Sequence, residues 1–319
     1  MRIALVTPFK DYAGGVESVN KVIEKIFLNS GFEVSYITLN NSTPRKIVDF
    51  FGPFLLFLKV LFSRSDLYIA NGEYGIACLT KKSIVIHHGS YYGYLKNTRQ
   101  YKPMLKRLKL IYKAFLQKTG SYNSFNISVS EYVREVLSEA GLKIDMVVPN
   151  TIEQKHINSH NTSRNNRILF IGNYDYYGKG IDIIEKISST FPFDAVSGKK
   201  IKNTVNLEQM DREKLLDMYG RYSLFFLPSR FEGMSMSVIE SLSAGTPILI
   251  SEVGDYKRIK KICPEFVCQI NDLNEVQEKI ENILNNQKKY IKTALNIYTQ
   301  LYSYSESEKL WKKAIENVI

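Results

Sequence analysis

Two carboxylates eight positions apart, Glu232 and Glu240, follow an apolar run over residues 223–227. We expect that run to be a strand, Glu232 to lie in the loop after it, and Glu240 to lie on a short helix that Gly245 and Pro247 end. The start of a helix attracts anions. Paired carboxylates beside an anion are unfavourable unless they bind neutral hydroxyl groups, which sugars carry. The pattern therefore predicts hydroxyl binding next to a phosphate.

The backbone amides of Met234, Ser235 and Met236 stand where that helix should begin, so we expect them to point toward the anion. Each carboxylate also has a simpler interpretation. Ser237 and Glu240 have the spacing of a capping box. Glu232 could be a solvated charge in a loop.

A glycine pair, Gly14-Gly15, follows the first expected strand and opens the first expected helix. Glycines there let the backbone approach a ligand, and the helix start favours an anion. A simple tight turn is the alternative. Because neither G-x-G-x-x-G nor the P-loop pattern is present, the sequence argues against the common NAD and ATP enzymes.

Strand-like and helix-like segments alternate along the chain, which predicts an α/β protein with parallel sheets. A polar stretch over residues 151–166 divides two such series, so we expect one domain over 1–150 and a second over 151–304. A last helix over 305–319 should pack back on the first domain. The expected strands cover residues 2–7, 33–39, 67–70, 83–87, 124–129 and 145–148, then 167–171, 193–196, 223–227, 247–251 and 266–269.

The block around the two carboxylates resembles the E-x7-E motif of retaining GT-B glycosyltransferases of family four. The resemblance continues along most of the chain in the family's order of landmarks. The matching residues are Gly14-Gly15, His88-Gly89, Ser128-Val129-Ser130, Val148-Pro149-Asn150, Gly172, Lys179-Gly180, Pro228-Ser229, Glu232-Gly233, Glu240, Ala244-Gly245-Thr246-Pro247 and Ser251.

This resemblance implies a GT-B architecture, in which two Rossmann-like domains with parallel sheets face each other across a cleft. The first domain would serve the acceptor and the second the nucleotide-sugar donor. Glu240 would bind the ribose, Glu232 the transferred sugar, and Lys179 the leaving diphosphate. His88 would lie near the reacting edge of the sugar, unless it is a structural histidine with its role shifted by one to His87. Gly14, Gly15 and the amides of Met234, Ser235 and Met236 would line the diphosphate and sugar.

One position departs from the family pattern. Where the family has Arg directly after the glycine of the phosphate motif, this chain has Asn173. Asn donates a hydrogen bond but carries no charge, and charge-assisted bonds to phosphate are about twice as strong. Another cation, such as Lys199, Lys200 or Arg230, could compensate.

No metal and no cofactor besides the donor substrate are expected. The D-x-D metal motif is absent, and His156 and His160 stand in the polar stretch without other obvious ligands. Lys179 and the helix ends would then stabilise the leaving group. The resemblance further implies retention of configuration, with a donor phosphate oxygen taking the acceptor's proton and no protein nucleophile.

The net charge of +11 is concentrated in residues 1–150, which carry +9 against +2 for the remainder. Residues 96–118 hold eight Lys or Arg and no acidic residue, and residues 50–61 are mostly apolar. An anionic membrane surface, a phosphorylated acceptor or nucleic acid could attract such a region. We favour the membrane and expect no nucleic-acid partner, because no nucleic-acid motif is present. The simpler alternative is an ordinary helix whose apolar face packs into the core.

The sequence therefore predicts a metal-independent glycosyltransferase that uses a nucleoside-diphosphate sugar, UDP favoured over GDP, and a saccharide or lipid-linked acceptor in surface polysaccharide assembly. It should be cytoplasmic, with reduced cysteines, and peripheral on the inner face of the cell membrane. A GT-B sugar-nucleotide epimerase and a non-catalytic sugar-binding protein are the alternatives.

Overall fold

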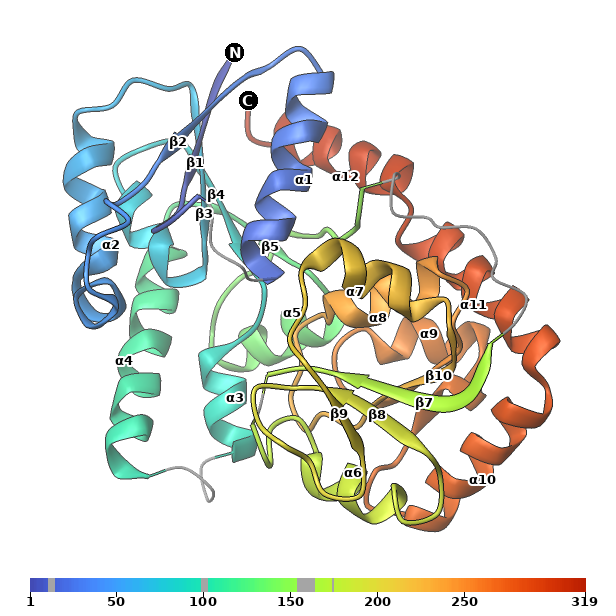
Figure 1. Ribbon diagram of the computed structural model, residues 1–319. Coiled ribbons are helices and arrows are strands. Elements are labelled where there is room, and N and C mark those ends of the chain that lie inside the picture. Colours follow the sequence, from blue (N-terminus) through green and yellow to red (C-terminus); the bar gives the residue numbers. More distant parts are fainter. Residues whose placement is uncertain (11–14, 99–102, 154–163, 174) are drawn as a thin grey trace. The chain divides into compact units, whose positions relative to one another are not determined.

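The computed structural model describes residues 1–10, 15–98, 103–153, 164–173 and 175–319, and divides them into two compact units. Unit 1 contains residues 1–150 and Ser307–Ile319, and unit 2 contains Thr151–Glu306. Each unit is built on one six-stranded sheet in which every strand pair is parallel. The α/β class with parallel sheets is therefore confirmed (Figure 1).

The sheet of unit 1 has the strand order β2-β1-β3-β4-β5-β6. The strands in the middle of this sheet are nearly continuous buried runs because helices cover both faces of a parallel sheet. The strands are β1 (Arg2–Val6), β2 (Glu33–Ile37), β3 (Leu67–Asn71), β4 (Ser83–His87), β5 (Phe125–Ser128) and β6 (Met146–Val147). The helices are α1 (Gly15–Asn29), α2 (Arg45–Leu61), the 3-10 helix η1 (Gly72–Cys78), α3 (Tyr91–Thr98), α4 (Met104–Gly120) and α5 (Glu131–Glu139).

The sheet of unit 2 has the order β12-β11-β10-β7-β8-β9. Strand β9 was not expected from the sequence, because it is only three residues long at the sheet edge, two of them exposed, and lacks an apolar run. The strands are β7 (Asn165–Ile171), β8 (Phe193–Val196), β9 (Val205–Leu207), β10 (Tyr222–Leu227), β11 (Ile248–Ser251) and β12 (Val267–Cys268). The helices are α6 (Ile181–Ile187), α7 (Arg212–Tyr219), α8 (Met236–Ser243), α9 (Tyr256–Ile262), η4 (Pro264–Phe266), α10 (Leu273–Asn285) and α11 (Gln287–Leu301).

The last helix, α12 (Tyr304–Glu316), carries the chain back to unit 1. Its buried Trp311 meets Phe27 of α1 edge to face, with ring centroids 5.6 Å apart. The side chain of Lys82 also donates to the backbone oxygen of Ile319 at 3.1 Å. The apolar side of this helix thus completes the core of the first unit rather than that of the second.

Candidate functional site

The carboxyl edge of the unit 2 sheet brings Lys179 and Glu232 into contact. Lys179 lies in the loop between β7 and α6, and Glu232 lies in the loop after β10, the strand next to β7. The Lys179 Nζ donates to Glu232 Oε2 at 2.5 Å. Both side chains keep partial access to solvent. Two residues 53 positions apart in sequence therefore form one charged pair at this edge.

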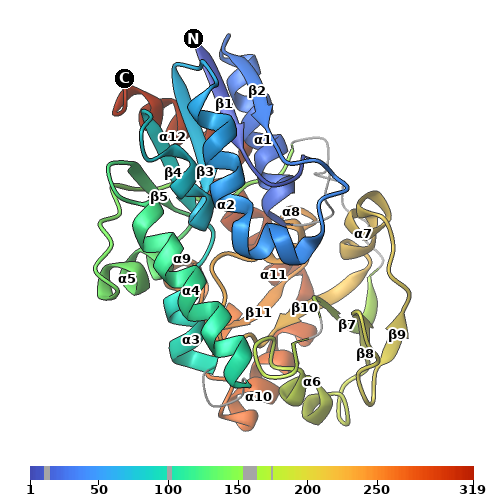
Figure 2. The ribbon, with the colours of Figure 1, turned by 90° about the vertical axis from the view of Figure 1, so that its left-hand side faces the viewer.

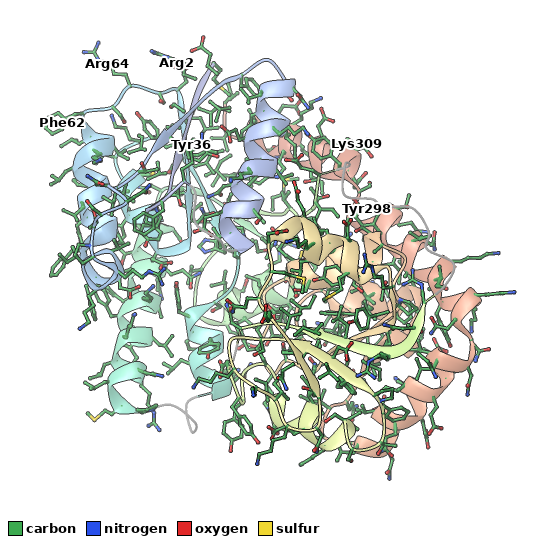
Figure 3. All side chains as sticks on the ribbon, viewed as in Figure 1. Arg2, Tyr36, Phe62, Arg64, Tyr298 and Lys309 are labelled. Atoms are coloured by element: carbon green, nitrogen blue, oxygen red, sulfur yellow. The ribbon has the colours of Figure 1, made fainter. Side chains whose placement is uncertain are left out.

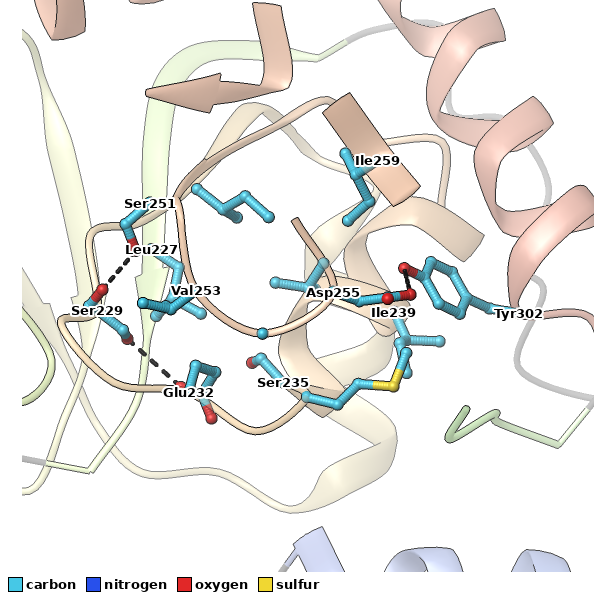
Figure 4. A pocket seen from close by; sticks show the side chains of 14 residues that line it. Leu227, Ser229, Glu232, Ser235, Ile239, Ser251, Val253, Asp255, Ile259 and Tyr302 are labelled. Carbon is cyan, nitrogen blue, oxygen red and sulfur yellow. Dashed lines mark hydrogen bonds between the residues drawn. The ribbon is translucent and has the colours of Figure 1, made fainter. Parts of the chain in front are cut away.

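Two serines support the loop that carries Glu232 (Figure 4). Ser229 Oγ donates to Glu232 Oε2 at 3.4 Å, and Ser251 Oγ at the end of β11 donates to the backbone oxygen of Ser229. Both serines are buried. A cavity of only about 20 Å³ lies beside this loop, lined mostly by apolar side chains. It has room for about one water molecule and none for a sugar.

Glu240 lies on α8 and is only 5% exposed. Its Oε2 accepts a hydrogen bond from Tyr219 Oη at 3.0 Å, which aligns the carboxylate. The capping-box interpretation of Glu240 is wrong, because the N-cap of α8 is Ser235 and Ser237 lies inside the helix. Burying a carboxylate lowers the stability of the fold unless hydrogen bonds compensate for its lost hydration, and Tyr219 supplies one here.

Met234 and Ser235 precede α8, and Met236 is its first residue. Met234 is buried, whereas Ser235 and Met236 are partly exposed. The Ser235 side chain accepts no capping hydrogen bond from the first amides of α8. A helix start in this state can donate to an anion.

Asn173 is exposed just beyond β7. The three cations that could compensate for the missing arginine lie in different surroundings. Arg230 donates to both carboxylate oxygens of Asp182 at 2.7 Å, so its charge is already matched. Lys199 and Lys200 are exposed in the loop after β8, the strand that pairs with β7.

In unit 1, His88 and the first turn of α1 line one cavity of about 390 Å³. Gly15 is the exposed first residue of α1, and Gly14 lies outside the described residues. The polar lining includes Glu17 of α1, Asn71 at the end of β3, and Glu73 of η1. A cavity of this volume falls in the range typical of small-molecule sites.

The two neighbouring histidines have different environments. His87 is completely buried, where its ring bonds Gln117, Ser121 and Asn126. Burial lowers the pKa of His87 and of His88 to about 4. His88 is partly exposed and bonds Asn71 Oδ1 through Nε2 at 2.9 Å. The structural histidine is thus His87, and His88 is the one that lines the cavity.

Among the residues that the structure describes, no cluster of three or more His, Cys, Asp or Glu side chains could hold a metal ion; His156 and His160 lie outside that set. In the same residues no helix combines the length and the apolar character needed to span a bilayer.

Several solved structures match the fold of this chain over nearly its whole length. Sucrose-phosphate synthase from Thermosynechococcus elongatus superposes with a TM-score of 0.80 at 16% identity, covering 99% of this chain and 98% of that one. WaaG, a glycosyltransferase involved in lipopolysaccharide biosynthesis, gives 0.71 at 14% identity over 96% and 98% of the two chains. Anabaena HepE in complex with UDP and glucose gives 0.69 at 13% identity over 98% and 99%. The fold is therefore that of the GT-B glycosyltransferases.

Sequence comparison points to the same class. Residues 197–300 match the family model of glycosyl transferases group 1. An uncharacterized glycosyltransferase, MJ1178 of Methanocaldococcus jannaschii, is 26% identical over 180 residues, 51% of this chain. The match spans only 50% of that relative's length. Fold and sequence together support a glycosyltransferase of the GT-B type.

Sequence reasoning missed several residues that shape these sites. Tyr219 aligns Glu240, Asp182 pairs with Arg230, and Asn71 bonds His88. Each belongs to a different element from its partner, and none stands in a motif. Only the tertiary contact identifies them.

Proposed function

We propose that this protein is a retaining glycosyltransferase that moves a sugar from a nucleoside-diphosphate sugar to a saccharide or lipid-linked acceptor in surface polysaccharide assembly. The observation that carries this proposal is the contact between Lys179 and Glu232 beside α8, with Glu240 buried in that helix. A cation and a helix start can bind phosphates, and carboxylates can accept hydrogen bonds from hydroxyls. The three features together suit a compound that carries both groups. The group 1 match over residues 197–300 supports it.

In this proposal unit 2 binds the donor. Glu240 accepts hydrogen bonds from the ribose hydroxyls, Glu232 from the hydroxyls of the transferred sugar, and Lys179 binds the diphosphate. The acceptor oxygen attacks on the face that the diphosphate leaves, and a donor phosphate oxygen takes its proton. Lys179 stabilises the negative charge that develops on the leaving group. No protein nucleophile and no metal take part.

UDP is the favoured nucleotide, since the neighbour HepE was solved with UDP and glucose. Calorimetric titration with UDP and GDP tests this choice directly. Glu240→Gln keeps the shape of the side chain but removes its charge. Because a hydrogen bond to a charged group contributes about 1.5–3 kcal/mol, we expect UDP binding to weaken about 10- to 100-fold in this variant.

Product analysis distinguishes the alternatives. A glycoside formed only when acceptor is present supports the transferase. Release of a free, epimerised sugar without acceptor would indicate the epimerase, and donor binding without turnover would indicate a sugar-binding protein. Unchanged UDP affinity in Glu240→Gln would contradict the donor site itself.

We also propose that unit 1 rests on an anionic membrane surface. Helices α2 and α4 lie side by side, as the stacked rings of Phe50 and Tyr112 and the ion pair of Lys109 with Asp49 show (Figure 2). On α4 only Leu116, Gln117 and Gly120 are buried, so the alternative in which its apolar face packs into the core is wrong for most of the helix. We call the exposed apolar residues of both helices the α2–α4 surface: Ile47, Phe50, Phe51, Phe54, Leu55, Leu58, Leu61 and Phe62, with Met104, Leu105, Leu108, Ile111 and Phe115.

These apolar residues lie on one side of each helix, at spacings of three and four. Phe62, directly after α2, is 83% exposed and points outward from unit 1 (Figure 3). Exposed Lys46 and Lys106 belong to the same two helices. Apolar side chains next to cations match the chemistry of an anionic bilayer interface. Lipid-linked acceptors would reach the protein there.

A further inference from the structure

The side chain of Gln117, on α4, reaches the segment that carries His88. Gln117 is only 3% exposed. Its Nε2 donates to the backbone oxygen of Gly89 at 2.8 Å, and its Oε1 accepts from the backbone nitrogen of Tyr91 at 3.2 Å. Its Nε2 also lies 3.1 Å from His87 Nδ1. One buried side chain therefore contacts the residues directly before and after His88, and the first residue of α3 as well.

The backbone groups decide which atom donates in each of these contacts. Because the Gly89 oxygen can only accept and the Tyr91 nitrogen can only donate, the amide of Gln117 has a single orientation. Its second amide hydrogen then goes to His87 Nδ1, so this ring nitrogen must accept. Both amide hydrogens of Gln117 are thus used within the protein.

The opposite side of the His87 ring agrees with this assignment. Asn126 Nδ2 donates to the backbone oxygens of Ser121 and Ser124, which leaves its Oδ1 to accept from His87 Nε2 at 3.3 Å. Ser121 Oγ donates to the backbone oxygen of Gln117, so it also accepts from His87 Nε2. Both contacts require the hydrogen on Nε2. His87 is therefore the neutral ring that connects Gln117 to the core of unit 1.

A close contact between backbones fixes the turn of α4 that carries Gln117. An added Cβ on Gly75 of η1 would lie 2.5 Å from the backbone oxygen of Gly120, and one on Gly120 would lie 2.6 Å from the backbone nitrogen of Ile76. Neither position has room for a side chain. Gly120 follows Gln117 by three residues and so lies almost one turn further along α4. The contact with η1 therefore sets where the Gln117 side chain can reach.

The residue one turn earlier on α4 supports the same segment. Lys113 Nζ donates to Glu73 Oε1 at 3.1 Å, and this oxygen also accepts from Tyr91 Oη at 2.8 Å. Tyr91 is thus held at its hydroxyl by Glu73 and at its backbone nitrogen by Gln117. The end of the segment that begins α3 is therefore anchored at two points.

We propose that Gln117 is a positioning residue for His88, which it fixes in the cavity wall by holding the residues on both sides of it. Its effect on turnover rests on the proposed transferase function, in which His88 lies near the reacting edge of the sugar. A small displacement of a group at that edge slows the reaction strongly. The nucleotide is bound by unit 2 in the same proposal, so its affinity should not depend on Gln117.

Nitrogen NMR of the histidine rings in the full chain tests the network without a ligand. The chain has four histidines, so His87→Gln and His88→Gln assign the two signals. We expect the wild type to carry hydrogen on His87 Nε2. Gln117→Glu keeps an acceptor for Tyr91 but loses both donors, so the hydrogen should appear on His87 Nδ1 and the ring signals of His88 should shift. Hydrogen on His87 Nδ1 in the wild type would overturn the proposal, even where the variant does not fold.

Gln117→Met measures the effect on the reaction, since its side chain has a similar length and adds no buried charge. We expect the release of UDP from UDP-glucose, with water as the acceptor, to fall about tenfold or more at saturating donor. UDP affinity in calorimetry should stay within about twofold. The ring signals of His88 should shift as well. Gln300→Met, at an exposed position on α11, is the matched control and should change none of the three.

Unchanged His88 signals in Gln117→Met would overturn the positioning role, as would unchanged turnover. A loss of UDP affinity as large as the loss of turnover would also overturn it, because it would indicate a general weakening of the fold. A wild-type protein that binds UDP but releases none from UDP-glucose would contradict the transferase proposal instead. The His88 signals in Gln117→Met would then decide the positioning role by themselves.

Discussion

Lys179 Nζ lies 2.5 Å from Glu232 Oε2, so two side chains with different proposed partners on the donor bind each other. Their side chains are 26% and 19% exposed. An ion pair in contact with water contributes little to stability, about 0–1 kcal/mol. The donor can therefore separate the two groups at small cost, with Lys179 moving to the diphosphate and Glu232 to the sugar.

The first prediction concerns Lys179→Ala. Removing the cation eliminates stabilisation of the leaving diphosphate, so we expect turnover to fall by about 10²-fold or more while the thermal midpoint changes little. Transfer rates at saturating and at low donor, together with thermal unfolding, measure both effects. Lys186→Ala, an exposed lysine on α6, is the matched control. Near wild-type rates in Lys179→Ala at both donor concentrations would show that the site is wrongly assigned.

Gly180 provides a second prediction, because it is the N-cap of α6 with a φ of 65°. A Cβ there would overlap the backbone oxygen of Pro228. We expect Gly180→Ala to lower the free energy of unfolding by about 2–3 kcal/mol and to reduce activity, since the adjacent Lys179 would shift. Gly220→Ala is the control, as an added Cβ there meets nothing within 4 Å. Equal denaturation midpoints for the two variants would contradict this.

A third prediction is that transfer does not need a divalent metal. The leaving group is stabilised by Lys179 and the start of α8 in the proposed mechanism, so EDTA should leave the rate within about twofold of its original value. The assay compares metal-free enzyme with and without added magnesium or manganese. Activity that disappears in EDTA and returns with manganese would refute the metal-independent mechanism.

The fourth prediction follows from the buried ring of His87, whose pKa is lowered to about 4 by burial. The pKa in the unfolded chain is about 6.5, so the unfolded state binds more protons between pH 6.5 and 4. Stability is therefore lost as the pH falls through this window, by about 3 kcal/mol from this group. Denaturant titrations across the window should show a shallower pH dependence in His87→Gln. Parallel curves for variant and wild type would exclude the effect.

The fifth prediction tests the α2–α4 surface by co-sedimentation with vesicles. Binding should require anionic lipid and weaken with salt, and Lys46→Glu with Lys106→Glu should reduce it, because each cation near such a surface contributes about 1 kcal/mol. Phe51→Ser with Leu105→Ser should reduce it as well. Lys109 is a poor target, because it is paired with Asp49.

Leu28→Ser is the matched control for this surface, since Leu28 is 52% exposed on α1. Its binding should equal that of the wild type. Complete recovery of the wild-type protein in the supernatant with anionic vesicles at low salt would refute the membrane proposal and leave the glycosyltransferase proposal intact.

The sequence by itself predicted the parallel sheets and most of their strands, because a strand covered on both faces must be a continuous apolar run. β4 begins and ends where the apolar run 83–87 does. The sequence also located Glu232, Glu240 and Lys179 in loops or helices after strands, since periodicity and glycine positions are local signals. The short edge strand β9 carries no such signal, and it was missed.

Contacts between distant residues were decided by the tertiary structure alone. Whether Glu240 caps its helix or lies buried against Tyr219 depends on where α8 begins and on what packs beside it. Which of His87 and His88 faces a cavity depends on one residue of strand register, which reverses the side of the sheet. Whether the apolar face of α4 is covered depends on its neighbours. The spacing of residues along the chain does not show which neighbours a side chain will have, because packing brings together side chains that are far apart in the sequence.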